Sequence, residues 1–348
     1  MDYESGAMMN VVDVLKIVFV FLTWLVSSWP SVAALPSADA ETEAALVELA
    51  ELLEIDPKVR HMNPRVTCLD GQLGIVVDYL AQDELGLLTN YPISHLFVNS
   101  SEIRDVTPLS KLPLRSLELV HLHPRTRSRL NMPPFGPIKG LETLPRGTLS
   151  CLGLSNADIV DLPMLNMFTN LTYLTLDGSI GVSNLQPLAG LSLRWLSVVA
   201  TDVVDLSPLK GMPLEDLNLT ATGVRDLSPL AGMRLKALKI LNTPVSSLAP
   251  LSGMPLERLW ISGTPVQDLS PLHRMPLQSL RIEDSAVTNI LPVCDSPLEY
   301  LSFTPGRITV GLDALRRVET LSLIKTSPGN LRFSSVSNFL EKACSGED

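Results

Sequence analysis

A four-residue phrase returns at a fixed interval along the chain: Leu206-Ser207-Pro208-Leu209, Leu227-Ser228-Pro229-Leu230, Leu248-Ala249-Pro250-Leu251 and Leu269-Ser270-Pro271-Leu272. Each copy begins 21 residues after the previous one. A fixed period of roughly 20 to 50 residues indicates stacked supersecondary units. The sequence therefore predicts a solenoid, and because a solenoid offers a broad surface, binding is the first functional hypothesis.

The repeating unit extends well beyond this phrase. Its copies, which begin at Pro92, follow the pattern Pro-Leu-x-x-Leu-x-Leu-x-x-Thr-x-Val-x-Asp-Leu-Ser-Pro-Leu-x-Gly-Met. In the copy that starts at Pro213, the alternation of Leu217-Asn218-Leu219 predicts a short strand with leucines inward and Asn218 outward. Neighbouring copies are then expected to pair as parallel strands.

The second half of each unit predicts a tight return. Ser228-Pro229 indicates an N-cap followed by proline at the first helical position, and Gly232 indicates where the turn ends. Few residues remain, so we expect a 3₁₀ or short helical turn. A column of hydroxyl side chains is expected to bond backbone groups at the corner after the strand; it holds Thr201, Thr222, Thr243, Thr264 and Ser285.

These motifs carry a family resemblance. The copy that runs from Leu214 to Leu230, Leu-x-x-Leu-x-Leu-x-x-Thr-x-Val-x-Asp-Leu-Ser-Pro-Leu, resembles a bacterial leucine-rich repeat of the internalin-like class. Lys210-Gly211-Met212-Pro213-Leu214 resembles planctomycete-type 21-residue repeats, some of which are fused to serine/threonine kinases. The segment from Phe303 to Leu312 resembles the closing segment of such arrays. Threonine stands where the family commonly has asparagine at the corner, and the chain shows no kinase signature.

The resemblance implies an α/β repeat solenoid with parallel strands on the concave face and 3₁₀ or short helical turns on the convex face. For function it implies only protein–protein interaction. Leu46, Leu49, Leu52 and Leu53 recur at helical spacing, which predicts a helical cap over the N-terminal end of the stack.

We expect four regions. Residues 1–40 form a signal peptide or membrane anchor plus a linker, and 41–91 form the N-terminal cap, with room for a degenerate repeat. Residues 92–324 form the array, with an insertion near 120–137, and 325–348 form a C-terminal tail.

The N-terminus resembles an export signal. The stretch from Ile17 to Leu25 is apolar apart from Thr23, Lys16 precedes it, and small residues follow. A run this short suits a signal-peptide core better than a membrane span. Asp2 and Glu4 fit poorly, which favours a true start at Met8 or Met9. We expect an exported protein (periplasmic, cell-surface or secreted); the alternatives are an uncleaved anchor and a buried helix of the folded domain.

Composition narrows the class of partner. The formal net charge is −10 and the pI is about 5.0, which argues against nucleic acid as a partner. The four cysteines are scattered without metal-type spacing, and no disulfide framework is indicated. Because no catalytic motif is present, we expect neither an enzyme nor a cofactor or metal. We also expect the chain to be monomeric.

The outward strand positions form two columns on the predicted concave face. Aromatic residues are only 5% of the chain, yet several lie in these columns beside basic residues. Trp, Tyr and Arg are the types enriched at binding hot spots. The candidate partner-binding residues are Tyr173, Trp195, Lys239, Arg258, Trp260, Arg281 and Tyr300. The alternative is that they only cover the sheet, with cation–π stacking around Trp260.

The insertion is the second candidate. Leu119 leads to Ile138 through a basic, proline-rich stretch, which predicts a loop leaving the solenoid edge to meet an acidic partner or an anionic surface. Its candidate residues are His121, His123, Arg125, Arg127, Arg129 and Phe135. A solvated insertion is the alternative. His121-x-His123 lacks a further ligand for a metal.

The sequence thus predicts non-catalytic protein–protein recognition through the concave face of a leucine-rich-repeat solenoid. Two alternatives stay open: an architectural envelope protein without a specific ligand, and a regulatory partner of a serine/threonine kinase system.

Overall fold

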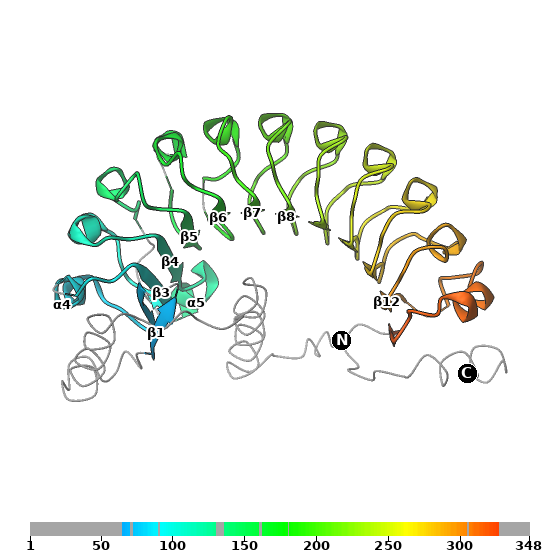
Figure 1. The fold of residues 1–348 in the computed structure, drawn as a ribbon, viewed down its shortest axis with the longest axis horizontal. Helices are drawn as coiled ribbons and strands as arrows, with labels where there is room; N and C mark the ends of the chain where they lie inside the picture. Colours follow the sequence, from blue (N-terminus) through cyan, green and yellow to red (C-terminus); the bar gives the residue numbers. More distant parts are fainter. Residues whose placement is uncertain are drawn as a thin grey trace, which may run out of the picture.

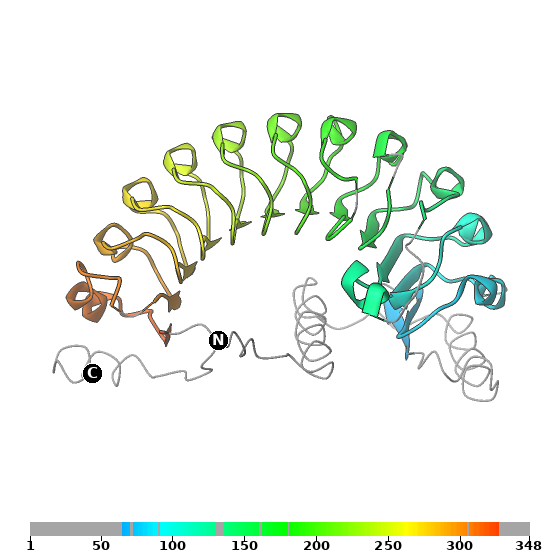
Figure 2. The same cartoon turned by 180° about the vertical axis from the view of Figure 1, so that it is seen from behind.

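The strands of this protein line the inner side of an arc, and short turns line its outer side (Figure 1). The computed structural model describes residues 65–69, 72–89, 91–129, 136–159, 162–179, 181–304 and 306–326. The predicted export segment at 1–40, the predicted helix at 41–60 and the predicted tail beyond 326 lie outside the described residues. Seen from behind, the described part is one continuous stack (Figure 2).

A single sheet runs through the whole stack. In the described part of the chain its thirteen strands follow one another in sequence order, and all pairs are parallel except β1 with β2, which is antiparallel. The strands are β1 (Arg65–Leu69), β2 (Gln72–Val77), β3 (His95–Ser101), β4 (Ser116–His121), β5 (Cys151–Ser155), β6 (Tyr173–Thr175), β7 (Trp195–Ser197), β8 (Asp216–Asn218), β9 (Ala237–Lys239), β10 (Arg258–Trp260), β11 (Ser279–Arg281), β12 (Tyr300–Ser302) and β13 (Leu323–Lys325).

The repeat is already present before Pro92. Gly74 of β2 lies opposite His95 of β3, an offset of 21 residues, which is the period of the later copies. Between these strands the chain returns through η1 (Gln82–Glu84) and α4 (Leu85–Leu88). This unit lacks the Leu-Ser-Pro-Leu phrase, so the period survives where the phrase does not.

The core is a set of ladders of identical side chains. The middle residue of each three-residue strand points inward, and Leu174, Leu196, Leu217 and Leu238 are fully buried. Each buried leucine contributes about 1.5–3 kcal/mol by leaving water. Because strand side chains alternate, the residues on either side of this leucine are directed to the concave face.

The convex returns are short 3₁₀ helices, as the sequence predicts. They are η2 (Thr107–Lys111), η3 (Leu141–Thr143), η4 (Leu162–Met167), η5 (Gln186–Leu188), η6 (Ser207–Leu209), η7 (Ser228–Leu230), η8 (Ala249–Leu251), η9 (Ser270–Leu272), η10 (Leu291–Val293) and η11 (Asp313–Arg317). One α-helix, α5 (Pro124–Arg129), interrupts this series between β4 and η3.

The prediction that Ser228 caps the turn is wrong. Ser228 is the first residue of η7, and Leu227 takes the N-cap position without a side-chain hydrogen bond. Asp226 does the capping instead: its Oδ1 accepts a hydrogen bond from the Ser228 backbone N–H at 2.8 Å. Asp205 and Asp268 repeat this arrangement. Because Pro229 has no N–H, the backbone N–H of Ser228 is the free donor at the start of the turn. The carboxylate of Asp226, two residues earlier, is placed to accept its hydrogen bond.

The hydroxyl column is confirmed. Thr222 Oγ1 donates to the Leu219 carbonyl oxygen at 2.7 Å, and Thr243 Oγ1 donates to that of Ile240 at the same distance. Thr201, Thr264 and Ser285 make the equivalent bond. Each hydroxyl therefore satisfies a buried carbonyl at the corner where the chain leaves the strand.

Candidate interaction surface

The pairing register aligns two columns of side chains on the concave face. The first column contains His95, Ser116, Cys151, Tyr173, Trp195, Asp216, Ala237, Arg258, Ser279 and Tyr300. The second column contains Phe97, Glu118, Gly153, Thr175, Ser197, Asn218, Lys239, Trp260, Arg281 and Ser302. These positions differ from copy to copy, whereas the leucines beneath them do not.

Two aromatic rings stack near the middle of the first column. The Tyr173 and Trp195 ring centroids are 4.0 Å apart and their planes differ by 5°. Strands of a sheet lie about 4.8 Å apart, so aligned aromatic residues on neighbouring strands are brought to stacking distance by the register itself. Both side chains remain partly exposed.

A cation–aromatic cluster lies nearer the C-terminal end. The Arg281 guanidinium is 3.9 Å from the centroid of the Trp260 ring and 5.2 Å from that of Tyr300. Lys239 Nζ is 5.1 Å from the Trp260 centroid. Such contacts contribute about 0.5–2 kcal/mol each, with the larger values at desolvated sites. They hold the rings and the guanidinium in fixed orientations.

Lys239 is not placed to contact a partner. The sequence put it among the candidate binding residues, but only 4% of its side chain is exposed. Its Nζ lies 3.6 Å from Asp216 Oδ1, and burial lowers the pKa of the ammonium group, although Asp216 opposes that shift. Arg258, whose Nη2 lies 3.7 Å from Asp216 Oδ2, keeps 43% of its side chain exposed. Lys239 therefore packs beneath the solvent-exposed side chains of the concave face, whereas the Arg258 side chain is exposed to solvent.

Sequence reasoning missed two carboxyl groups on this face. Burial, reinforced by the charge of Asp177, raises the pKa of Glu118 to about 8. Burial also raises the pKa of Asp177 to about 6, although Asp177 Oδ1 accepts hydrogen bonds from Ser197 Oγ at 2.6 Å and from the Val199 N–H at 2.8 Å. The signal that was available is Gly153, which leaves a gap in the second column beside Glu118.

The insertion is more ordered at its root than the sequence indicated. His121 is buried, with Nε2 at 3.0 Å from the Ile103 carbonyl oxygen and Nδ1 at 3.3 Å from that of Ser155. Arg127 on α5 is also buried. The alternative of a solvated insertion is therefore wrong for these two residues, and their burial also leaves them little surface with which to meet the predicted acidic partner. Burial holds the pKa of His121 below its usual range, which favours a structural, uncharged imidazole.

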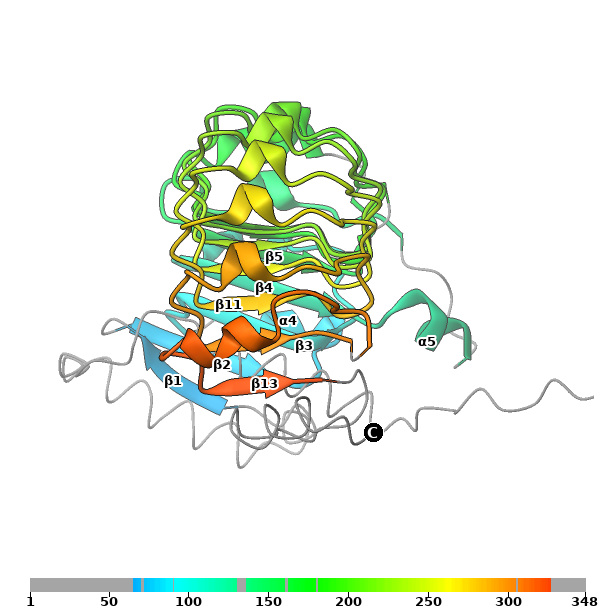
Figure 3. The same ribbon diagram turned by 90° about the vertical axis from the view of Figure 1, so that its right-hand side faces the viewer.

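Beyond His121 and Arg127, the structure describes only part of the insertion. His123 is exposed, and α5 projects from one edge of the solenoid (Figure 3). The side chains of Arg125, Arg129 and Phe135 lie outside the described set. Among the described residues, no three His, Cys, Asp or Glu side chains gather as metal ligands.

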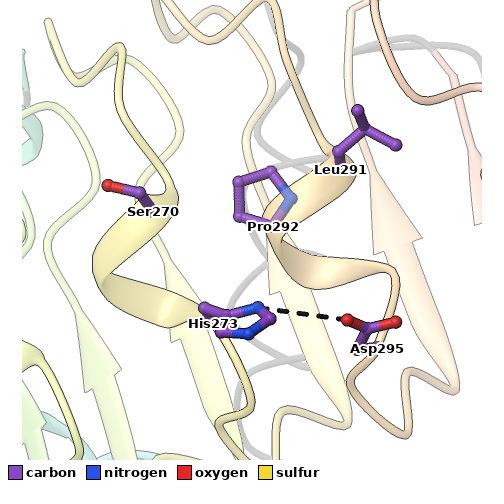
Figure 4. Close-up of a pocket in the computed structure, with 5 residues that line it drawn as sticks. All are labelled: Ser270, His273, Leu291, Pro292 and Asp295. Atoms are coloured by element: carbon purple, nitrogen blue, oxygen red, sulfur yellow. Dashed lines mark ion pairs between the residues drawn. The ribbon is translucent and has the colours of Figure 1, made fainter.

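A depression on the convex face is lined by Ser270, His273, Leu291, Pro292 and Asp295 (Figure 4). His273 Nδ1 lies 4.0 Å from Asp295 Oδ2, and both side chains are at least half exposed. An ion pair this open contributes about 0–1 kcal/mol. The described residues contain no helix with the length and apolarity required to span a bilayer.

Solved structures of internalins have a fold similar to that of this chain. An internalin (inlF) from Listeria monocytogenes aligns with 86% of this chain and 100% of its own, with a TM-score of 0.51 and 19% identity. The fold is a leucine-rich-repeat solenoid. Internalin C2 from the same species aligns with 47% of this chain and 74% of its own, at 25% identity and a TM-score of 0.43.

The structure of a TLR13–ssRNA13 complex aligns with 74% of this chain and 43% of its own, at 16% identity and a TM-score of 0.48. No protein-family model and no curated protein matches the chain. At these identities the likeness establishes the solenoid fold alone.

Proposed function

We propose that the protein recognises another protein, without catalysis, through the concave face of its solenoid. One observation carries the proposal: four of the chain's nine Trp and Tyr residues (4 Trp and 5 Tyr) lie in the two concave columns of β6 to β12. They come from copies far apart in sequence and occupy the positions that do not repeat. Scaffold requirements explain the leucines but not these residues.

The packing of these side chains suits recognition. Rigid aromatic rings and stacked guanidinium groups lose little conformational freedom on binding, so more of the contact energy remains for affinity. The Tyr173–Trp195 stack and the Trp260–Arg281–Tyr300 cluster are both ordered by contacts within the array. We propose these two groups as anchors, together with Arg258, which lies on β10 beside Trp260.

The location and assembly are proposed from the sequence. The apolar stretch from Ile17 to Leu25 supports export or membrane anchoring. The sequence of the repeats supports a solenoid, which we propose to be monomeric. The likeness to planctomycete-type repeats remains part of this proposal. No contact among the described residues favours an architectural role or a kinase partnership over recognition.

Capture of partners by the purified chain tests the proposal. The double variant Trp195→Ala/Trp260→Ala should lose capture from envelope and extracellular protein fractions while keeping its far-UV spectrum. Its unfolding midpoint should fall modestly, because the ring contacts of both tryptophans are lost, but the chain should stay folded at the temperature of the capture assay. Val204→Ala/Leu291→Ala is the matched control, because it removes exposed apolar side chains, 57% and 47% exposed, from other parts of the surface. Equal capture by the double tryptophan variant and the wild type would refute recognition by this face.

A further inference from the structure

The space above Gly153 is occupied by a carboxylic acid. A Cβ atom at position 153 would lie 2.5 Å from Glu118 Cγ and 3.1 Å from Glu118 Cδ. The Glu118 side chain therefore bends along the sheet from β4 across β5 toward β6. Its neighbours in the first column, Ser116 and Cys151, are small. The absence of a side chain at Gly153 is what lets the carboxyl group lie there.

Polar atoms around this carboxyl group lack partners. Glu118 is only 9% exposed, and among the described residues no donor bonds its carboxyl oxygens. Thr175, 4% exposed, follows Gly153 in the second column, and its hydroxyl has no hydrogen-bond partner at proper geometry within the described part of the chain. The Tyr173 hydroxyl lies next to that of Thr175 and likewise makes no hydrogen bond of good geometry within the described residues. Buried polar groups are usually satisfied, so this cluster is unusual for a finished surface.

The missing interaction is a positive charge. Burial acts against the ionised form of both acids. For Asp177 this effect is partly offset by the hydrogen bonds from Ser197 and Val199 and by the charge of Lys239, whereas for Glu118 nothing offsets it and the Asp177 charge adds to it. Trp195 covers one face of the Tyr173 ring, so the opposite face is turned toward the small residues of β5. An acid beside an aromatic face is the usual environment for an ammonium or guanidinium group.

We propose that the protein partner inserts a lysine or arginine side chain beside Glu118 and Asp177, with its alkyl stem against Tyr173. This inference rests on the proposed function and names the chemistry of the partner. The net charge of −10 favours encounter with a basic protein surface. The inserted cation would also supply a donor to the oxygens that lack one.

The site is sensitive to pH. The titratable groups around Glu118 are Cys151 on β5, Tyr173 on β6 and Asp177 in the turn after β6, with His95 on the adjoining β3. The raised pKa of Glu118, about 8, means that the free protein holds a proton there at neutral pH. A cation binds the ionised form, so binding releases that proton and affinity increases as the pH rises toward about 8.

Fluorine-labelled Gly-Ser peptides with one central Lys, Arg, norleucine or Glu test the site, with binding to the full chain followed by NMR. The Lys and Arg peptides should bind more tightly than the norleucine and Glu peptides by at least about tenfold, and Glu118→Gln should abolish that preference. The preference should also strengthen from pH 6 to pH 8, the range set by the two acids. Glu257→Gln, which removes a carboxylate from the flank of β10, is the matched control and should change nothing.

Three results would overturn the site: no binding of the Lys and Arg peptides, equal binding of the norleucine peptide, or an unchanged preference in Glu118→Gln. The proposed function is judged separately, by the capture experiment with the double tryptophan variant. Loss of capture there, together with an unchanged preference here, would keep concave-face recognition and reject the cation site.

Discussion

At the scale of single residues, the same strand carries side chains with two different duties. Residues that repeat satisfy the backbone or fill the core, as Thr243 does when it donates to the Ile240 carbonyl oxygen at 2.7 Å. Residues that vary, such as Glu118, face the concave side. Substitutions at repeated positions should therefore affect stability alone, whereas substitutions at variable positions should affect binding, and stability too where the side chain is buried.

Thr243→Val should destabilise the protein by about 0.5–1.5 kcal/mol, because the substitution keeps the shape of the side chain and removes one buried hydrogen bond. Urea unfolding measures the change. Ser252→Ala, on the exposed side of the next turn, is the control and should leave the midpoint in place. Equal midpoints for Thr243→Val and the wild type would contradict the structural duty assigned to the column.

Glu118 should make stability fall as the pH rises. Its pKa is raised in the folded state from 4.5 to about 8, so the folded protein binds the proton more tightly than the unfolded chain does. The stabilisation is complete below the unfolded pKa and is lost as the pH passes through the folded one. Urea midpoints from pH 5 to pH 8 should decline more steeply for the wild type than for Glu118→Gln; parallel curves would be incompatible with a buried acid at this position.

Gly153 and Glu118 should be energetically coupled. Gly153→Ala places a methyl group where the Glu118 side chain lies, so it should destabilise the wild type. In a Glu118→Ala background the same substitution should cost far less, giving a coupling energy of about 0.5–3 kcal/mol in a double-mutant cycle. Additive effects of the two substitutions would show that the Glu118 side chain does not lie over Gly153.

At the scale of elements, the turn shows how far a sequence pattern can be interpreted. The period, the strand alternation and the 3₁₀ returns follow from Leu, Pro and Gly spacing, because those residues act locally. Asp226 rather than Ser228 caps the turn because the helix begins at Ser228 itself. A sequence pattern does not fix the first residue of a helix to within one position, and the identity of the capping residue depends on that position. The burial of His121 depends on contacts with Ile103 and Ser155 from other copies, which local pattern does not report.

Asp226→Ala should lower the urea midpoint at neutral pH. The hydrogen bonds from Ser228 hold the pKa of Asp226 below its usual value of 3.8. A lowered pKa contributes stability above the unfolded pKa, and that contribution disappears as the pH falls through the folded one. The difference between variant and wild type should therefore shrink as the pH falls below that usual value. Arg225→Ala, its exposed neighbour, is the control; a difference that persists at low pH would exclude ionic capping.

At the scale of the whole molecule, the stack turns sequence-distant residues into neighbours. The candidate columns were predictable because the 21-residue period fixes which residues align. The electrostatics of the columns could not be predicted, because the raised pKa values of Glu118 and Asp177 and the burial of Lys239 depend on how neighbouring side chains pack over one another. The concave face therefore carries acids toward its N-terminal end and a cation–aromatic cluster toward its C-terminal end.

Site-specific photo-crosslinking measures most directly which face meets a partner. A p-benzoylphenylalanine at Ser279, in the first concave column of β11, is compared with one at Ser270, on the exposed convex turn η9 of the preceding copy. If the concave face binds the partner, position 279 should give a discrete crosslinked protein that disappears in the Trp195→Ala/Trp260→Ala background, and position 270 should give none. Crosslinks from position 270 alone, or a product from position 279 that survives the double substitution, would contradict recognition by the concave face.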